Sequence, residues 1–399
     1  MSTTIRRKDL VILCQFGGNL IPIAMINRRA MNQNDGCLIR FVISKNLVIN
    51  IGTVDGYGCH IAYINTNRYN RSMTNILEDF TKSIDNRISL FDIKIDTESN
   101  GTLKLSGRLL DGSQLDELPR LFPTRKLDTA SIRILNTEPL EQVYVTTNLT
   151  GLYEKPTFGM PLSSELHYGT ELKILDEQDN WVFTCQTDGY LGWAYRPYLG
   201  EGSARAATHL VLAPVIELRS EPNETGEIVT RVMSGTGVTV EEMRDGWSQV
   251  KANKSGWILS RHLRPVNDLP NSLEEKRDFI IKDSQRMVGI PYLWGGTSGN
   301  GIDCSGFARL LHRWVGINIP RDADMQWNAA KPVELPYEVG DLFFFAEDDS
   351  KRNISHVGIS LGGWKMIHSS RSRNGVYVDD IQETKYLKDI FASVGSFLR

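Results

Sequence analysis

The 399-residue chain lacks any uninterrupted apolar run of about 18 residues, so the sequence predicts no membrane-spanning helix. It also lacks an excess of charge, because 45 basic and 48 acidic side chains leave a formal net charge of -3. That balance gives no electrostatic reason to expect nucleic acid or an anionic membrane as a partner. Low-complexity segments and long charge runs are absent as well. A chain of this length is expected to fold into roughly two to four domains.

Cysteine is scarce: the five cysteines are odd in number and widely spread, and no two form a Cys-x-x-Cys pair. This usage disfavours a disulfide framework and a structural zinc site, and suits a reducing compartment. The N-terminus is basic and then apolar, but the apolar run breaks at Gln15 and no small-residue cleavage site follows. We therefore expect a buried strand over 10–16 instead of a signal peptide, and a cytoplasmic protein. The sequence suggests no metal or organic cofactor.

Residues 1–128 are predicted to form an α+β domain of unknown role. Short apolar runs such as LVILCQF predict strands, and SMTNILEDFTKSI has the spacing of a helix with one apolar face. Asn100-Gly101 between two alternating segments predicts a β-hairpin. The cysteines and the histidine of this domain lack the spacing of metal ligands, so we expect no chemistry in it.

The middle of the chain contains a repeat, over residues 140–202 and 205–267. Trp181 and Trp247 are 66 residues apart, and several turn residues recur at the same offset. A period this long predicts a duplicated domain, and strand-rich units of this size close into small barrels. The second copy resembles a bacterial SH3-type domain, so we predict two SH3-type β-barrels.

The last segment, residues 268–399, contains GIDCSGFARLLHRW, in which Cys304 stands at the start of a predicted helix. The apolar residues that follow recur at the spacing of one buried helical face, and His312 is expected on the exposed flank. Backbone N–H groups and the dipole at a helix start favour a thiolate, which a nucleophilic cysteine needs. The alternative is a buried cysteine that only packs as a small hydrophobe.

Two histidines, His356 in NISHVGISL and His368 in WKMIHSS, lie on predicted strands joined around a Gly-Gly pair. If the loop has three residues, 361–363, His356 lies directly opposite His368 and both rings share one face. A two-residue Gly-Gly loop would place the rings on opposite faces, and the sequence leaves both registers open. In the first register His356 can take the proton of Cys304 while His368 orients the His356 ring.

The segments PYLWGGTSGNGIDCSGF, INIPRDADMQ, ISHVGI and IHSS occur in the order found in the NlpC family of papain-like cysteine peptidases, which residues 273–399 resemble. The resemblance implies an α+β domain in which a helix carrying the cysteine packs on an antiparallel sheet carrying the histidines. It also implies a catalytic triad of Cys304, His356 and His368. The oxyanion hole would use the Cys304 N–H and Tyr292.

The order of domains resembles the γ-D-glutamyl-L-diamino-acid endopeptidases of the dipeptidyl-peptidase VI type. This resemblance implies a thiol peptidase that hydrolyses peptidoglycan-derived muropeptides through a thioester. Because no secretion signal is expected, we predict that it acts inside the cell on recycled cell-wall fragments. Its partners would be small peptides of the L-Ala-γ-D-Glu-diamino acid type with a free amine. The residues implied to hold that substrate are Asp303, Ser305, Asp322 and Tyr190.

One position departs from the family pattern. Ser163 stands where these relatives carry a glutamate that helps to close the amine end of the cleft. Glu165 would share the face of Ser163 if the strand is regular, and it could then substitute for that glutamate. Trp294, in the glycine-rich YLWGG segment, could either line the cleft or pack beneath the loop.

Three other activities compete with this interpretation. The peptidase could act on intact cell wall as a general peptidoglycan hydrolase. A catalytically spent domain would leave a cell-wall-binding adaptor, against which the intact Cys304, His356 and His368 argue. Related folds transfer acyl chains through a cysteine, but Asp303 and Asp322 near the nucleophile disfavour an apolar substrate.

Overall fold

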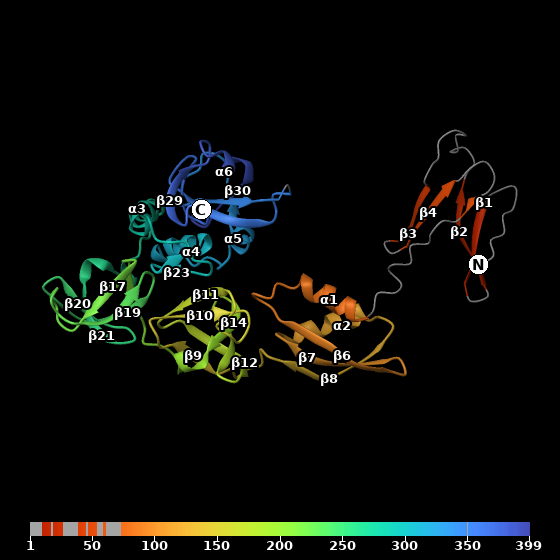
Figure 1. The fold of residues 1–399 in the computed structure, drawn as a ribbon, viewed down its shortest axis with the longest axis horizontal. Coiled ribbons are helices and arrows are strands. Elements are labelled where there is room, and N and C mark those ends of the chain that lie inside the picture. Colours follow the sequence, from red (N-terminus) through yellow and green to blue (C-terminus); the bar gives the residue numbers. More distant parts are fainter. Residues whose placement is uncertain are drawn as a thin grey trace. The chain divides into compact units, whose positions relative to one another are not determined.

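The chain contains two compact units. The first comprises Met1–Ser83, Ile93–Leu105 and Pro119–Thr129, and the second comprises Ile84–Asp92, Ser106–Leu118 and Ala130–Arg399. No helix among the described residues is long and apolar enough to cross a bilayer. Figure 1 shows the computed structural model, which describes residues 10–16, 19–26, 39–44, 47–53, 59–60, 73–348 and 350–399.

The described residues up to Ile134 form short strands and two α-helices. These elements are β1 (Leu10–Phe16), β2 (Asn19–Ile26), β3 (Ile39–Ser44), β4 (Leu47–Thr53), β5 (Cys59–His60), α1 (Met73–Ser83), β6 (Phe91–Ser99), β7 (Thr102–Leu109), α2 (Glu117–Leu121) and β8 (Lys126–Ile134). The strand predicted over 10–16 and the predicted helix are confirmed as β1 and α1. The predicted hairpin joins β6 and β7, and Asn100 and Gly101 both have positive φ angles, of 49° and 74°. Cys37 lies outside the described residues.

The sequence repeat is also a repeat in three dimensions. The first copy consists of β9 (Gln142–Val145), β10 (Leu149–Tyr153), β11 (Leu162–His167), β12 (Glu171–Gln178), β13 (Trp181–Gln186), β14 (Leu191–Tyr195) and β15 (Leu199–Glu201). The second consists of β16 (His209–Val211), β17 (Val215–Arg219), β18 (Ile228–Met233), β19 (Gly237–Arg244), β20 (Trp247–Lys251), β21 (Ser255–Leu259) and β22 (Leu263–Pro265).

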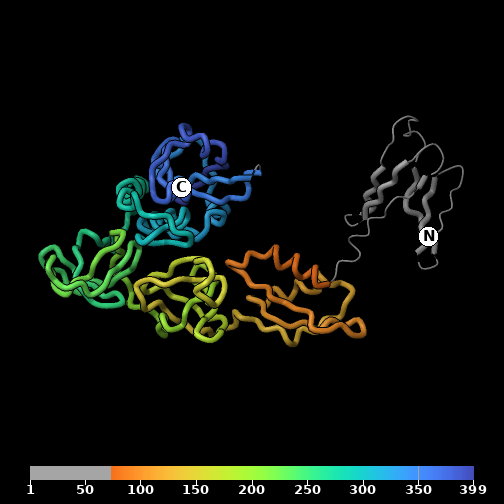
Figure 2. Tube along the Cα trace, in the orientation of Figure 1, coloured from red at the N-terminus to blue at the C-terminus, as the bar shows by residue number. Residues whose placement is uncertain are grey.

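The two copies have equivalent strand orders, β11-β10-β14-β13-β12-β9-β15 and β18-β17-β21-β20-β19-β16-β22. Their turns are equivalent too, because Asp179 and Asp245 both have a φ of 53°. Gly169 and Gly235 have φ angles of 80° and 81°, which favour glycine. The predicted duplication is therefore confirmed, and Figure 2 follows the chain through both copies in yellow and green.

The last domain packs helices against a six-stranded antiparallel sheet of order β25-β30-β26-β27-β28-β29. Its helices are α3 (Leu273–Ser284), α4 (Cys304–Trp314), α5 (Ala323–Ala329) and α6 (Lys385–Ile390). Its strands are β23 (Thr297–Ser298), β24 (Gly301–Ile302), β25 (Lys331–Pro332), β26 (Leu342–Ala346), β27 (Ile354–Ser360), β28 (Lys365–Ser370), β29 (Gly375–Asp380) and β30 (Phe391–Ser396).

Helix α4 has the buried face that the spacing predicts, since Phe307 and Trp314 are both 0% exposed. The helix is followed by Gly316, whose φ is 80°. The expectation for His312 is wrong: it is 0% exposed, and its Nδ1 lies 2.8 Å from the carbonyl oxygen of Ala308. Phe397, near the chain end, packs edge-on against this ring, so a residue far away in sequence covers the flank.

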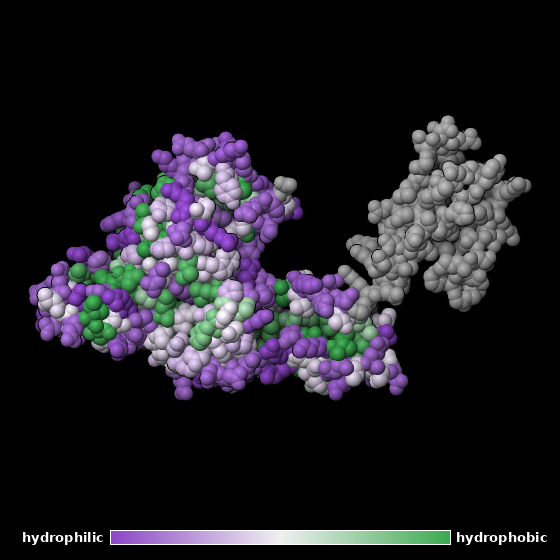
Figure 3. Space-filling view, viewed as in Figure 1, coloured by the Kyte–Doolittle hydropathy of each residue, from purple (hydrophilic) through white to green (hydrophobic). Residues whose placement is uncertain are grey.

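Both barrels are hydrogen-bonded to the last domain within the second unit. The Trp314 indole donates to the carbonyl of Val211 in the second barrel at 3.2 Å, and the Glu165 N–H of the first barrel donates to Gly295 at 3.0 Å. Figure 3 shows hydrophilic side chains over most of the visible face of these domains, with apolar ones in small patches.

Candidate active site

Cys304 is the first residue of α4, and the preceding Asp303 caps the helix by accepting the Gly306 N–H at 2.6 Å. The cysteine is 7% exposed. It lines a cleft of about 1010 Å³ whose wall also includes His356 and His368. The predicted placement of the thiol at a helix N-terminus, in a cleft shared with both histidines, is therefore what the structure has.

The two histidines share a face, but the register of their strands is neither of the two that the sequence left open. Ser360 pairs with Met366, so the loop is Gly362–Trp364 and lies one residue later than expected. Trp364 packs against Tyr337, with ring centroids 4.9 Å apart, which removes it from the ladder. The histidines are diagonal neighbours instead of direct partners, and a shift of two residues keeps both on one face. His356 Nε2 lies 2.7 Å from His368 Nδ1.

Asp379 extends this pair on the side away from His356. Its Oδ2 lies 2.8 Å from His368 Nε2, and its Oδ1 accepts from Arg373 at 2.6 Å. A carboxylate accepts only, so with both rings neutral His368 Nε2 carries a proton and His368 Nδ1 accepts from His356 Nε2–H. The remaining nitrogen of His356, Nδ1, is then an unprotonated base.

Burial favours the neutral forms of Cys304 and His356. Burial and the nearby Asp303 carboxylate raise the pKa of the Cys304 thiol to about 12, although the N–H groups of Val357 and Ser305 act in the opposite direction. Burial, together with His368, holds the pKa of His356 well below its usual value. The expected thiolate is therefore wrong for the free protein, because desolvation outweighs the helix N-terminus. Cys304 and His356 thus line one cleft as a neutral thiol and a neutral imidazole.

Tyr292 lies on the cleft wall and is tied to the start of α4 by an isolated bridge to Ile302. Burial and the neighbouring Cys304 and Asp303 raise its pKa, so its hydroxyl stays a hydrogen-bond donor. Trp294 lines the same cleft and is 61% exposed, which decides between its two predicted positions. Both side chains are available to a bound peptide.

The carboxylate oxygens of Asp303 accept hydrogen bonds from other groups of the protein. Its two oxygens accept from Arg321 at 3.1 and 2.7 Å, from the N–H groups of Gly295 and Gly306, and from the Ser305 hydroxyl. Arg321 is 1% exposed and also donates to Ser305. Asp303 and Ser305 therefore shape the start of α4, and their carboxylate and hydroxyl are shared with a buried guanidinium.

Asp322 lies in the cleft and is brought together with Tyr190, as predicted from the family pattern. The Tyr190 hydroxyl donates to Asp322 Oδ2 at 3.0 Å. A second donor, which the sequence did not suggest, is Arg87, whose Nη1 lies 2.9 Å from the same oxygen. We call this part of the cleft, formed by Arg87, Tyr190 and Asp322, the Asp322 end.

Glu165 is not in this cleft. Leu152 pairs with Ser164 and Tyr153 pairs with Leu162, so Ser163 is the extra residue of a β-bulge. The bulge breaks the regular alternation of side chains between the two faces of the strand, on which the prediction depended. The prediction that Glu165 takes the place of the glutamate found in relatives is therefore wrong.

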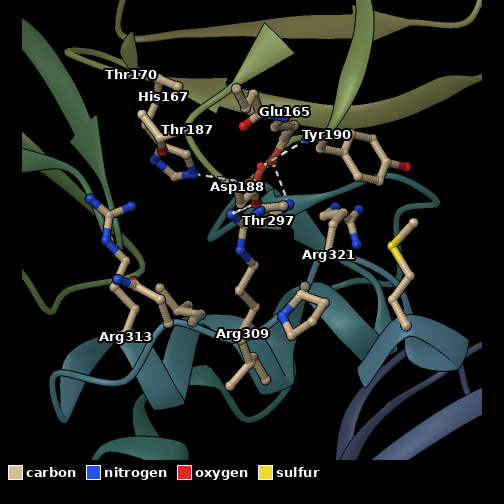
Figure 4. A pocket seen from close by; sticks show the side chains of 18 of the residues that line it. Glu165, His167, Thr170, Thr187, Asp188, Tyr190, Thr297, Arg309, Arg313 and Arg321 are labelled. Atoms are coloured by element: carbon tan, nitrogen blue, oxygen red, sulfur yellow. Dashed lines mark hydrogen bonds and ion pairs between the residues drawn. The ribbon is translucent and has the colours of Figure 1, made fainter. Parts of the chain in front are cut away.

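Glu165 instead lines a second cavity of about 770 Å³. Figure 4 shows this cavity, with the hydroxyl of Tyr190 pointing away from Glu165. Glu165 Oε2 accepts the Thr297 N–H at 2.7 Å, and burial raises its pKa. It therefore joins the first barrel to the last domain.

Comparison with known proteins identifies this architecture. Residues 289–395 match the NlpC/P60 family, residues 214–264 the bacterial SH3 domain, and residues 152–194 the bacterial dipeptidyl-peptidase SH3 domain. The chain is 30% identical to the γ-D-glutamyl-L-lysine dipeptidyl-peptidase of Bacillus subtilis (strain 168) over 242 residues, which are 58% of this chain and 80% of the relative. The chain belongs to the NlpC/P60 family.

Two further proteins agree with this assignment. The dipeptidyl-peptidase 6 of Lysinibacillus sphaericus is 25% identical over 63% of this chain and 96% of its own length. The crystal structure of an NlpC/P60 protein from Bacillus cereus ATCC 10987 superposes with a TM-score of 0.57 at 23% identity, over 65% of this chain and 100% of that one, and shows the same fold. The predicted family, the two SH3-type domains and the fold class are confirmed, and the protein is a peptidase.

Three residues of this NlpC/P60 site went unnoticed in the sequence. Arg321 precedes Asp322 in the PRD segment. An arginine that is buried at this position needs a carboxylate partner, and Asp303 beside Cys304 could have been proposed as that partner. Asp379 follows Tyr377, the partner of His368, by two residues, so strand alternation places it on the face of His368. Arg87 left no such signal, because nothing in the sequence around it shows that it approaches Asp322.

The raised pKa of the Cys304 thiol predicts how the rate of its alkylation depends on pH. Alkylation of Cys304 by iodoacetamide is expected to speed up by about tenfold per pH unit between about pH 7 and pH 10, without a plateau, because the thiol pKa is about 12. The rate is measured by mass spectrometry, with the Cys304→Ala protein reporting labelling at other thiols. A plateau near neutral pH would instead indicate a preformed thiolate.

Proposed function

We propose that this peptidase hydrolyses the γ-D-glutamyl-L-diamino acid bond of peptidoglycan-derived peptides, with Cys304 as nucleophile and His356 as base. The observation that carries the proposal is the 2.7 Å contact between the rings of His356 and His368 in the cleft that Cys304 lines. The substrate class rests on the relatives named as γ-D-glutamyl-L-lysine dipeptidyl-peptidases, which are 27–30% identical.

In the proposed reaction the Cys304 thiol gives its proton to His356 Nδ1 as sulfur bonds to the carbonyl carbon of the γ-D-glutamyl group. His356 returns that proton to the nitrogen of the diamino acid as the C–N bond breaks, which leaves a thioester on sulfur. Water, activated by His356, then attacks the thioester carbon, and sulfur leaves with the proton restored. Because thiol and imidazole are both neutral at rest, proton transfer accompanies the attack.

The oxyanion that forms in both steps needs donors that are in place beforehand. The backbone N–H of Cys304 at the start of α4 and the Tyr292 hydroxyl are the proposed donors. His368 would hold the His356 ring, and Asp379 would stabilise the imidazolium that develops during the reaction. Asp379 is suited to this role because its bond to His368 lowers its pKa.

We also propose that the protein works in the cytoplasm on small free peptides, as in cell-wall recycling. Among the described residues Cys185 and Cys304 are free thiols, and a reducing compartment preserves a nucleophilic thiol. Cell fractionation tests this proposal, and recovery of the protein only from the wall or the medium would contradict it.

A product assay tests the proposed activity. Purified protein is incubated with L-Ala-γ-D-Glu-L-Lys and with the corresponding diaminopimelate peptide, and the products are identified by mass spectrometry. We expect release of L-Ala-D-Glu and the diamino acid, and no release by the Cys304→Ala protein. Cleavage of intact sacculi without cleavage of the free peptides would favour a general peptidoglycan hydrolase instead.

A further inference from the structure

Two arginines stand in the tight turn that joins β28 and β29, and the structure engages only one of them. Arg373 Nη1 donates to Asp379 Oδ1 at 2.6 Å, and its guanidinium lies over the Tyr377 ring, 4.4 Å from the centroid. Arg371 lines the cleft and is exposed, and none of the described residues forms an ion pair or a hydrogen bond with its guanidinium. Its five N–H groups are therefore available to a ligand in the cleft.

The residues before this turn are anchored beside the start of α4. The Ser369 hydroxyl donates to the carbonyl of Ile302 at 2.6 Å, and Tyr292 forms its isolated bridge with the same Ile302. Arg371 follows Ser369 by two residues, and its charge is close enough to Tyr292 to oppose the rise in the Tyr292 pKa that burial mainly causes. Arg371 therefore lies on the Tyr292 side of Cys304.

The Asp322 end is built from other elements and has the opposite charge. Arg87 is shared there by three carboxylates, because it forms ion pairs with Asp85, Asp322 and Asp324 at 2.7, 2.9 and 2.6 Å. The Asp322 end thus keeps a negative charge, which suits an ammonium group. Within the described part of the chain, no hydrogen bond or ion pair joins Arg371 to these residues.

Arg371 is one of two arginine or lysine side chains on the described cleft wall that have no acidic partner. Arg87 and Arg108 are both held in ion pairs with aspartates. The second unpaired side chain is Lys155, which is exposed in the loop between β10 and β11 of the first barrel. A peptide anion that reaches the Tyr292 side of the cleft therefore meets a free guanidinium.

The proposed substrate carries such an anion. A peptide whose amine lies at the Asp322 end, and whose γ-glutamyl carbonyl lies at Cys304, has its diamino acid on the opposite side, toward Tyr292 and Arg371. When the diamino acid is the last residue of the peptide, its α-carboxyl group is free and negatively charged. A planar guanidinium can hold a carboxylate by two parallel N–H···O bonds.

We propose that Arg371 is a specificity-determining residue, which binds the free α-carboxylate of the diamino acid that leaves on cleavage. This inference rests on the proposed function and names the substrate class that the cleft prefers, namely short peptides that end at the diamino acid. A peptide that continues past the diamino acid has an amide in place of this carboxylate, and it loses the charge-assisted bonds to Arg371.

Three peptides test the inference: L-Ala-γ-D-Glu-L-Lys, the same peptide amidated at the lysine α-carboxyl group, and the same peptide amidated at the D-Glu α-carboxyl group. On the lysine amide the wild-type protein is expected to lose about tenfold in kcat/KM, mainly through a higher KM, because binding is weakened and the chemistry at Cys304 is unchanged. In Arg371→Gln the free acid and the lysine amide should differ by less than about threefold. Arg371→Lys should retain part of the preference, since it keeps the charge but not the planar fork.

Lys155→Gln is the matched control, because it removes the other unpaired positive charge from the same cleft wall. It should preserve the wild-type ratio of the free acid to the lysine amide. An equal fall of that ratio in Lys155→Gln would mean that the overall charge of the cleft sets the preference, which overturns the proposal. A wild-type protein that cleaves both peptides equally well also overturns it. If Arg371→Gln instead removes a preference for the free D-Glu carboxylate, the assignment to the leaving diamino acid is wrong.

Binding of the free acid and the lysine amide to the Cys304→Ala protein, measured by calorimetry, separates this inference from the proposed function. We expect the free acid to bind about tenfold more tightly, and the difference to disappear when Arg371→Gln is added. If binding follows this pattern but the wild-type protein cleaves neither peptide, the proposed function fails while the inference stands. If the wild-type protein cleaves the peptides and Arg371→Gln changes no ratio, the inference fails while the function stands. Absence of binding by both peptides overturns both.

Discussion

Replacing Cys304 by alanine is expected to lower kcat/KM on γ-D-glutamyl peptides by roughly four to six orders of magnitude, because it removes the sulfur that forms the thioester. His356→Gln should cost a similar factor, since a thiol whose pKa is about 12 depends on a base for its activation. The double variant should be no slower than either single variant, because nucleophile and base act as one unit. Steady-state kinetics with chromatographic detection of the dipeptide product measures all three.

His209→Gln provides the matched control for this series, because His209 lies in β16 of the second barrel and does not line the cleft. Its kcat/KM should equal that of the wild type. His368→Asn should cost less than His368→Ala, since an asparagine can still hold the His356 ring. A double variant much slower than both Cys304→Ala and His356→Gln would contradict the interpretation of a single catalytic unit.

Arg321→Met is expected to lower the free energy of unfolding by about 3–5 kcal/mol, because Asp303 would remain as a buried carboxylate without its counter-charge. Arg321 is 1% exposed and bonds Asp303 through two nitrogens. The same change should lower kcat/KM by about tenfold to a hundredfold, since Asp303 fixes the first turn of α4 and with it the position of Cys304. Urea denaturation followed by tryptophan fluorescence, together with peptide kinetics, measures both effects.

Arg264→Met separates stability from catalysis. Arg264 is also buried, 6% exposed, and pairs with Asp283 at 2.6 Å, but neither residue lines the cleft. Its loss should destabilise the protein by less than Arg321→Met, because Asp283 keeps the bond from Arg286 Nε at 2.9 Å, and should leave kcat/KM of the folded protein unchanged. The double change Asp303→Asn with Arg321→Met should recover part of the stability. Wild-type stability of Arg321→Met would show that the pair does not hold the helix start.

Features that depend on neighbouring residues were predictable. The spacing of apolar residues after Cys304 predicted α4 and its buried face, and Asn100-Gly101 predicted the hairpin between β6 and β7. The 66-residue offset of Trp181 and Trp247 predicted the duplicated barrel. The helix follows from the 3.6-residue period, the hairpin from the turn preference of two adjacent residues, and the duplication from a repeated sequence, so each can be read from the order of residues alone.

The register of the histidine strands shows where this reasoning ends. The sequence left open a three-residue loop, 361–363, and a two-residue Gly-Gly loop, and the structure has neither, because its loop is Gly362–Trp364. The contacts of Trp364 with Tyr337 and Phe343 exclude it from the ladder, and these contacts join residues from different strands and loops. The bulge at Ser163, which separates Glu165 from the cleft, is likewise invisible in strand periodicity.

The order of residues along the chain was enough to specify the helix that begins at Cys304, the strands that carry both histidines, and the family to which they belong. Three-dimensional packing was needed to set the charges in the cleft: the neutral state of Cys304, the pairing of Asp303 with Arg321, and the arrival of Arg87 at Asp322 from 235 residues away. The physical reason is that periodicity is a local property of the chain, whereas desolvation and ion pairing are sums over neighbours supplied by other elements.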